Sequence, residues 1–327
     1  MSFYVNRHTY YCLPWFWPEP TPFISEVPHI GLVRGRARRQ LYRCQVTVPP
    51  QVQKFLERQR LTDGHAPLSD AKMTALNNPE RWVMIADESG PVAVGVVATH
   101  RQPDSSVHWT FETAVDGPMR FQAFEDKVVS EVIGLVPPGA SMSGWSRRSS
   151  LDASLERIGF SSVRSLSEMA TPLPIEPNES DPAPDLVVRS FNDDDVETLV
   201  SINAATFGEH REAGSLDREE VKSLMSESWF DAKGLLFHEV GGVVAGFCWT
   251  KVHESGEGEI YRIGVDPQFH SAGIGRGIVL AGLEYLESER GCTTGFLWVD
   301  EANTPAMRLY RAIGFTTRSR NREFAPG

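Results

Sequence analysis

The chain has 327 residues, of which 41% are hydrophobic and 23% charged, and its formal net charge is −11. This composition is typical of a globular protein with about two domains. The acidic balance argues against a nucleic-acid partner, and no long apolar run predicts a membrane span or a signal peptide. The four cysteines are scattered without metal-binding spacing. Together these features predict a cytoplasmic protein without a metal site.

Residues 1–45 form an atypical N-terminal extension. An aromatic and proline-rich run covers 10–18, and five arginines lie between Arg34 and Arg43. Neither piece has the periodicity of a helix or a strand. We expect a poorly ordered extension, with a partner-binding arm as the alternative.

From Val46 to residue 170 the hydrophobic pattern becomes regular and predicts a first α/β domain. The predicted helices cover 50–60, 69–76, 121–136 and 151–158, and the predicted strands cover 81–86, 92–99, 107–115, 141–145 and 163–169. Residues 171–186 are rich in proline and acidic side chains, and they predict a linker that sustains no packed element.

The same order of elements then begins again over 187–327. The predicted strands cover 187–191, 235–240, 243–252, 259–265 and 295–299, with a last strand from 315, and the predicted helices cover 193–207, 217–228, 276–290 and 304–313.

The two halves match each other directly. The segment 155–165 aligns with 310–320 through a shared Ile-Gly-Phe, and 90–99 aligns with 241–250. The protein is therefore predicted to duplicate one α/β unit. The register that pairs Gly95 with Gly246 sets His108 opposite Glu259. Because the first half has no counterpart of Gly273-Ile274-Gly275, we expect the chemistry in the second half.

That glycine-rich stretch follows a predicted buried strand and a turn at Pro267, and it opens a predicted helix. Gly273 and Gly275 lack a Cβ, so a phosphate can approach the backbone and the first N–H groups of the helix. A dinucleotide site is excluded because the third glycine of Gly-x-Gly-x-x-Gly is missing. The stretch therefore predicts a phosphate-binding loop of another kind.

Two separated motifs in the second half resemble the GCN5-related N-acetyltransferase (GNAT) superfamily. They are Val265-Asp-Pro267 with His270-Ser-Ala-Gly273-Ile-Gly275, and then Asn303-Thr-Pro-Ala306-Met-Arg-Leu-Tyr310 followed by Gly314-Phe315. The duplicated layout, with 247–253 ahead of the strand from Glu259, further resembles the mycothiol synthase family. The resemblance implies an α/β fold of two tandem GNAT-like domains, each a mixed, mostly antiparallel sheet flanked by helices.

The resemblance also implies a reaction. A monomer would use acetyl-CoA as cosubstrate, without a metal, to acetylate a small-molecule amine, the cysteine α-amine of desacetylmycothiol (cysteinyl-glucosaminyl-inositol). Two alternatives remain open at this stage. One is a GNAT acetyltransferase for another small-molecule or peptide amine, and the other is a non-catalytic CoA-binding module.

The resemblance assigns roles to individual residues. Glu259 would take a proton from the incoming ammonium, and Tyr310 would protonate the leaving thiolate. Acetyl-CoA would be held by Ile263, Gly264, Val265, His270, Ser271, Ala272, Gly273, Ile274, Gly275, Arg276, Asn303 and Arg308. The acceptor would be held by Asp70, Glu212, Lys251, Glu259 and Trp298.

Two positions depart from the family pattern. The family has Gln-Arg-Arg where this chain has His270-Ser271-Ala272, so we expect weaker acetyl-CoA binding than in relatives. A family tyrosine is replaced by Trp298, which removes a hydroxyl. From the residue types alone, Asp70 also fits a first-turn helix acid and Tyr310 a packed helix aromatic.

Overall fold

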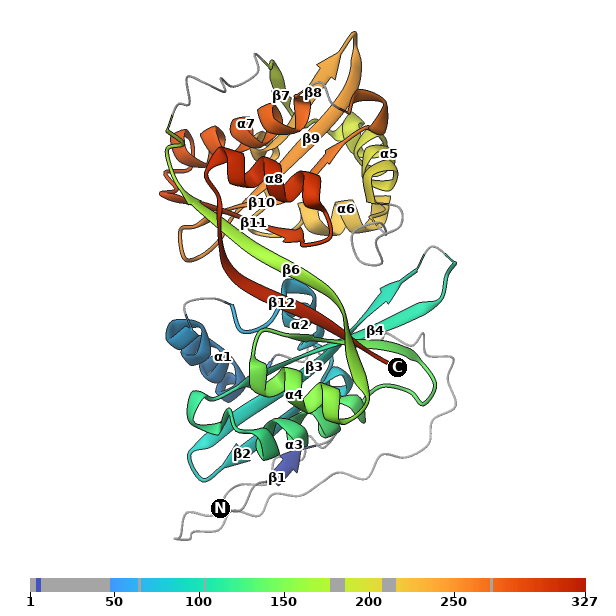
Figure 1. Ribbon diagram of the computed structural model, residues 1–327, viewed down its shortest axis with the longest axis vertical. Coiled ribbons are helices and arrows are strands. Elements are labelled where there is room, and N and C mark those ends of the chain that lie inside the picture. The colour runs from blue at the N-terminus through green and yellow to red at the C-terminus, as the bar shows by residue number, and fades with distance from the viewer. Residues whose placement is uncertain are drawn as a thin grey trace, which may run out of the picture.

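The computed structural model describes residues 4–6, 48–63, 66–102, 104–176, 186–207, 216–270 and 273–327. Glu212, Ser271, Ala272 and most of the N-terminal extension lie outside these residues. One twelve-stranded sheet runs through the described chain, in the order β1-β2-β3-β4-β5-β12-β6-β11-β10-β9-β8-β7 (Figure 1).

The first half supplies six strands and four α-helices. The strands are β1 (Tyr4–Asn6), β2 (Trp82–Asp87), β3 (Gly90–Arg101), β4 (Val107–Val115), β5 (Ser141–Ser146) and β6 (Phe160–Pro172). The helices are α1 (Pro50–Asp63), α2 (Asp70–Ala75), α3 (Gln122–Ile133) and α4 (Ser149–Arg157). One core packs α1 and the chain around α2 on the sheet, and a second packs α3 and α4 on it.

The second half repeats this plan. Its strands are β7 (Val188–Ser190), β8 (Leu235–Val240), β9 (Val243–Val252), β10 (Gly258–Val265), β11 (Thr294–Asp300) and β12 (Thr316–Pro326). Its helices are α5 (Val196–Phe207), α6 (Arg218–Met225), α7 (Ile274–Ser288) and α8 (Thr304–Ile313). An aromatic core lies beneath α5 and α6, and a separate aliphatic core lies beneath α7 and α8.

The prediction of a mixed, mostly antiparallel sheet flanked by helices is confirmed. Among the described strand pairs, β4–β5 and β10–β11 are parallel, and the other pairs are antiparallel. Instead of forming two separate sheets, however, the halves share one sheet.

The two halves exchange a strand at the middle of that sheet. β6, which closes the first half in sequence, pairs along β11 of the second half from Leu166↔Asp300 to Pro172↔Thr294. β12, the last strand of the chain, lies between β6 and β5 of the first half. Figure 1 shows the two strands, pale green and dark red, crossing between the two bodies. Each half is therefore completed by the other.

Three local expectations were wrong. The predicted linker is in part a strand, because β6 continues to Pro172 and Thr171 pairs with Gly295 of β11. Residues 4–6 of the extension form β1, which pairs antiparallel with β2. Backbone pairing to an open sheet edge needs no side-chain periodicity, so the sequence pattern did not reveal this strand.

The third difference concerns the start of α7. This helix begins at Ile274, two residues earlier than predicted, with Gly273 as its N-cap at φ 76°. The left-handed conformation is inexpensive for a glycine, so the helix can start directly after it. Gly275 and Arg276 consequently lie in the first helical turn.

Candidate active site between the strands β10 and β11

The two central parallel strands of the second half separate soon after they meet. β10 pairs with β11 only at Gly258↔Gly295 and Glu259↔Phe296. On its other side, β10 stays paired with β9 as far as Val265↔Gly246. The backbone after Glu259 therefore has no ladder partner on the β11 side among the described residues. This leaves an open strand edge inside the sheet.

A bulge at Tyr261 accompanies the opening. The β9–β10 register shifts between Ile260 and Arg262, whereas the matching β3–β4 ladder of the first half has no shift. A bulge adds one residue to a strand and bends it. The extra residue belongs to the half in which the strands separate, so we attribute the separation to it.

The N-terminus of α7 follows this open edge. The first intrahelical bond runs from Gly277 N to Gly273 O at 3.1 Å. The N–H groups of Ile274 and Gly275 therefore have no acceptor within the helix. A Cβ on Gly275 would meet no atom closer than 3.7 Å, so protein packing does not require this glycine. A glycine at this position would instead leave space for an approaching anion.

The remaining predicted cofactor residues lie on β10, directly after it, and on α8. His270 Nε2 lies 3.1 Å from Val265 O, and Asn303 caps α8 by accepting a hydrogen bond from Ala306 N at 3.2 Å. Arg308 is exposed on α8. Ile263 and Gly264 belong to the part of β10 that lies beyond its pairing with β11.

Glu259 lies at the point where the strands begin to separate. Its side chain is 11% exposed, and His253 Nε2 lies 2.7 Å from Glu259 Oε2. Glu259 is the direct ladder partner of Lys251, so the two side chains share one face of the sheet. A buried carboxylate and a buried ammonium are thus neighbours at the opening.

Lys251 connects this place with the first half of the chain. Its Nζ lies 2.5 Å from Asp70 Oδ2, across 181 residues of sequence. The ammonium also lies over the rings of Trp229 and Tyr261, at 4.9 and 5.5 Å from their centroids. Burial raises the pKa of Tyr261 to about 12, so its hydroxyl stays protonated. Asp70, Lys251 and Glu259 therefore lie on one surface between the two halves.

Tyr310 belongs to the opposite face of the sheet. It is buried in the core beneath α7 and α8, together with Cys248, and its ring packs against Phe315. Burial raises the pKa of Tyr310 well above its ordinary value. Burial also raises the pKa of the Cys248 thiol to about 12, which makes it a poor nucleophile. Tyr310 and Glu259 therefore lie on opposite faces of the sheet.

Trp298 lies on β11 opposite Glu168 of β6. The Arg147 guanidinium, which follows β5 of the first half, lies 4.8 Å from the Trp298 ring centroid. Burial alone would raise the pKa of Glu168, but hydrogen bonds from Arg318 and Ser319 lower it. The tryptophan thus forms part of a charged contact between the halves.

The equivalent place in the first half is closed. β4 and β5 stay paired as far as Phe111↔Gly144, and a Cβ on Gly144 would collide with the Phe111 ring. Beyond this point Arg148 donates to Thr113 O at 3.1 Å and to Glu125 Oε1 at 3.0 Å. The pair that matches Lys251 and Glu259 is His100 opposite His108.

Both histidines are held in the interior of the first half. Burial lowers the pKa of His100 to about 4, and His108 bonds the Ser141 and Ser143 hydroxyls at 2.8 and 2.9 Å. The first half therefore lacks the carboxylate that the second half presents.

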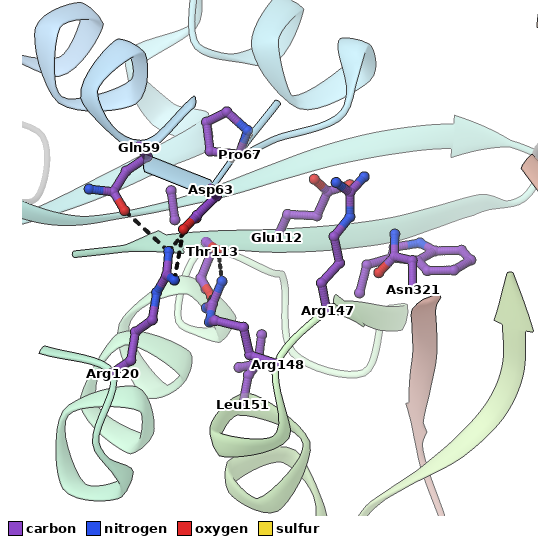
Figure 2. Close-up of a pocket in the computed structure, with 12 residues that line it drawn as sticks. Gln59, Asp63, Pro67, Glu112, Thr113, Arg120, Arg147, Arg148, Leu151 and Asn321 are labelled. Carbon is purple, nitrogen blue, oxygen red and sulfur yellow. Dashed lines mark hydrogen bonds and ion pairs between the residues drawn. The ribbon is translucent and has the colours of Figure 1, made fainter. Parts of the chain in front are cut away.

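A cavity of about 190 Å³ remains beside the closed strands (Figure 2). Its polar lining is already paired: Arg120 donates to Asp63 and Gln59, and Arg148 donates to Thr113. These side chains bond to one another, and the strands beside the cavity are paired. The cavity therefore lacks the open strand edge of the second half.

Sequence reasoning missed His253, Arg147 and the bulge at Tyr261. His253 stands two residues after Lys251, and alternate residues of a strand face the same side, so strand periodicity could have pointed to it. Arg147 lies 151 residues from Trp298, and no local pattern links them. No group of three His, Cys, Asp or Glu side chains suited to a metal occurs in the described chain. None of its helices is long and apolar enough to cross a membrane.

Comparison with known proteins agrees with this architecture. Residues 197–315 match the Acetyltransferase (GNAT) family. A GCN5-related N-acetyltransferase from Sphaerobacter thermophilus superposes with a TM-score of 0.63 at 20% identity, covering 84% of this chain and 91% of that one. A tandem GNAT protein from the clavulanic acid biosynthesis pathway has a TM-score of 0.62 at 14% identity, covering 84% and 94%. The fold is therefore that of a tandem GNAT protein.

Similarity in sequence defines the family more closely. A mycothiol acetyltransferase of Thermobispora bispora is 41% identical over 172 residues, which cover 49% of this chain and 56% of that protein. The chain thus spans little more than half the length of this relative. A mycothiol acetyltransferase of Renibacterium salmoninarum is 33% identical over 277 residues, covering 78% of this chain and 80% of that protein. The chain belongs to the mycothiol acetyltransferase family.

Proposed function

We propose that this protein transfers the acetyl group of acetyl-CoA to the cysteine α-amine of desacetylmycothiol, and that the second half carries the reaction. The observation that supports this most is the opening between β10 and β11, with Glu259 at its start and the N-terminus of α7 following β10. The identity of the acceptor is inferred from the names of the relatives. The binding of an acyl-CoA is inferred from the opening between the two strands.

The residues present suit acetyl-CoA. On the β11 side, the Ile263 backbone and the Val265 N–H can pair with the pantetheine amides, as an added strand would, whereas Val265 O already contacts His270 Nε2. The N–H groups of Ile274, Gly275 and Arg276 point toward the start of α7, where the helix dipole favours an anion such as the pyrophosphate.

Glu259 is suited to act as the base. At neutral pH the acceptor amine is mostly an ammonium, which cannot attack a thioester until it loses a proton. The carboxylate removes one ammonium proton: the N–H bond breaks, its electron pair stays on nitrogen, and an O–H bond forms. The freed amine then attacks the thioester carbonyl carbon. When the tetrahedral intermediate collapses, the C–S bond breaks, CoA leaves as the thiolate, and the surplus proton on nitrogen passes to the thiolate or to water.

Tyr310 serves the leaving group. Because its pKa is raised, the hydroxyl is protonated throughout the neutral range and can donate a hydrogen bond to the departing thiolate. The raised pKa makes complete proton transfer harder, so hydrogen-bond donation is its main role here. A backbone N–H of the open β10 edge would stabilise the oxyanion of the tetrahedral intermediate.

The acceptor would lie between the halves. Asp70 of α2 and Lys251 of β9 bring opposite charges to the surface that contains Glu259, and they suit a polyhydroxylated substrate that carries an ammonium. Glu212 and Trp298 complete the proposed set, with Glu212 outside the described residues. Because Trp298 lacks the family hydroxyl, only its ring can contact the acceptor.

Calorimetric titration of the whole chain with acetyl-CoA tests the proposed site. We expect one molecule bound per chain, because the corresponding strands of the first half are paired and bridged by Arg148. Two molecules per chain would contradict the assignment to the second half alone. No heat at millimolar acetyl-CoA would contradict the proposed function itself.

The loop before α7 gives a second prediction. Replacing His270, Ser271 and Ala272 by Gln, Arg and Arg adds two cations beside the pyrophosphate site, and we expect acetyl-CoA to bind about tenfold more tightly. The gain should shrink as salt is added, since screening weakens exposed charges. The same titration measures it, and an unchanged Kd at low salt would show that the loop does not contact the pyrophosphate.

A further inference from the structure

His253 is held firmly beside Glu259. It follows β9 at the turn into β10, where its backbone N donates to Glu257 O at 3.0 Å and its carbonyl accepts from Gly256 N at 2.9 Å. Its ring centroid lies 5.1 Å from that of Phe296, which is buried on β11. The backbone and the ring of His253 are therefore both fixed by neighbours.

The contact with Glu259 is short and specific. His253 Nε2 lies 2.7 Å from Glu259 Oε2, and the side chains are 29% and 11% exposed. An ionised carboxylate can only accept, so the shared proton is on Nε2. This bond engages one carboxylate oxygen, and it leaves Oε1 for a proton of the acceptor ammonium.

We propose that His253 is a positioning residue for Glu259. The Nε2–H donor holds Oε2 and so orients the carboxylate toward the acceptor. The proposal rests on the role of Glu259 as the base. No proton passes to His253 in the step: the ammonium N–H bond breaks and the Oε1–H bond forms, while the Nε2–H···Oε2 bond persists.

The other charged groups around this pair have partners of their own. Lys251 is the ladder neighbour of Glu259 and pairs with Asp70. On the other side, Arg318 lies 5.2 Å from the Phe296 centroid. Arg318 pairs with Glu257 at 2.5 Å and with Glu168 at 2.8 Å. None of these bonds involves the His253 side chain, so replacing His253 removes the His253–Glu259 bond and none of them.

The test compares His253→Leu, which removes the donor, with His253→Gln, whose amide nitrogen can occupy the place of Nε2. In steady-state assays with acetyl-CoA and desacetylmycothiol, we expect His253→Leu to lower kcat about 10- to 100-fold, the scale of a hydrogen bond to a charged group. The KM for acetyl-CoA should not change.

The conservative variant His253→Gln should recover most of kcat, because its amide restores the donor. The exposed neighbour Glu254, on the same turn, provides the control Glu254→Gln, which should behave as wild type. If His253→Leu does not fold, His253→Asn replaces it, since its amide is one methylene too short to reach Oε2.

Two results would overturn the proposal. One is a wild-type kcat in the donor-free variant. The other is an equal loss of kcat in the Leu and Gln variants, which indicates a packing role. The variant Glu259→Gln in the same assay distinguishes a failure of the proposed base, Glu259, from a failure of the positioning role of His253. If it is fully active, the role of Glu259 fails as well; if it is impaired while His253→Leu is normal, only the role of His253 fails.

Discussion

Replacing Glu259 by Gln is expected to lower kcat about a hundredfold, on the scale of losing a general base. Glutamine keeps the size and the hydrogen-bonding capacity of the side chain, but it cannot take a proton from an ammonium. The Glu259 side chain is 11% exposed at the point where β10 and β11 separate, so bulk water is poorly placed to substitute for it. The binding of acetyl-CoA should be unaffected.

The measurement is a steady-state thiol-release assay, with acetyl-CoA affinity determined by titration. Glu284→Gln, an exposed position on α7, is the matched control and should keep full activity. Near-normal turnover of Glu259→Gln would remove this residue from catalysis. Lost affinity for acetyl-CoA together with lost turnover would show that Glu259 supports the cofactor site instead.

Replacing Phe324 by Ala should reduce the free energy of unfolding of the whole chain by about 3 to 5 kcal/mol. Phe324 is 1% exposed on β12, and it belongs to the core of the first half although it lies three residues from the C-terminus. Native proteins are stable by only about 5 to 15 kcal/mol, so this change removes a large share. Since β6 and β12 are exchanged, both halves should lose stability together.

Urea unfolding followed by circular dichroism and tryptophan fluorescence measures this effect. We expect one transition with a lower midpoint and an unchanged slope. Val163→Ala is the control, because Val163 is 56% exposed on β6 and should change the free energy of unfolding by less than about 0.5 kcal/mol. Two separate transitions in the wild type, or a loss confined to one half, would contradict the coupling through the exchanged strands.

Much of the fold was predictable because its signals are local. The bounds of β8, β9 and α8 agree with the hydrophobic pattern residue for residue, and β4 does so as well. The Gly273-Ile274-Gly275 stretch marked the start of a helix after a buried strand, and the structure has that order. Periodicity and glycine chemistry act within a few residues, so a single sequence contains them.

The strand exchange was not predictable from the same signals. β6 and β12 come from aligned segments of the two repeats, so each has a pattern that suits either sheet edge. Which edge a strand pairs with depends on contacts between the halves, which local patterning does not specify. The bulge at Tyr261 was not predicted for a similar reason, because an extra residue changes the register only relative to its partner strand.

The proposed site also contains residues that a local motif predicts and contacts that no local motif predicts. Gly273, Gly275 and Glu259 follow from the motif within one stretch of sequence. The contact between Asp70 and Lys251 joins positions 181 residues apart, and only the family resemblance placed both at the acceptor. The contact of Arg147 with Trp298 had no signal of either kind, since it forms only when the two halves are placed together.

The most direct test of the central claim is thiol release by the purified whole chain with acetyl-CoA and a set of amines. The account predicts rapid release of CoA thiol with desacetylmycothiol, and little with peptides or polyamines at the same concentration. Equal or faster release with a peptide or polyamine would assign the chain to another acceptor. Binding of acetyl-CoA without thiol release from any amine would contradict the claim of catalysis and leave a CoA-binding protein.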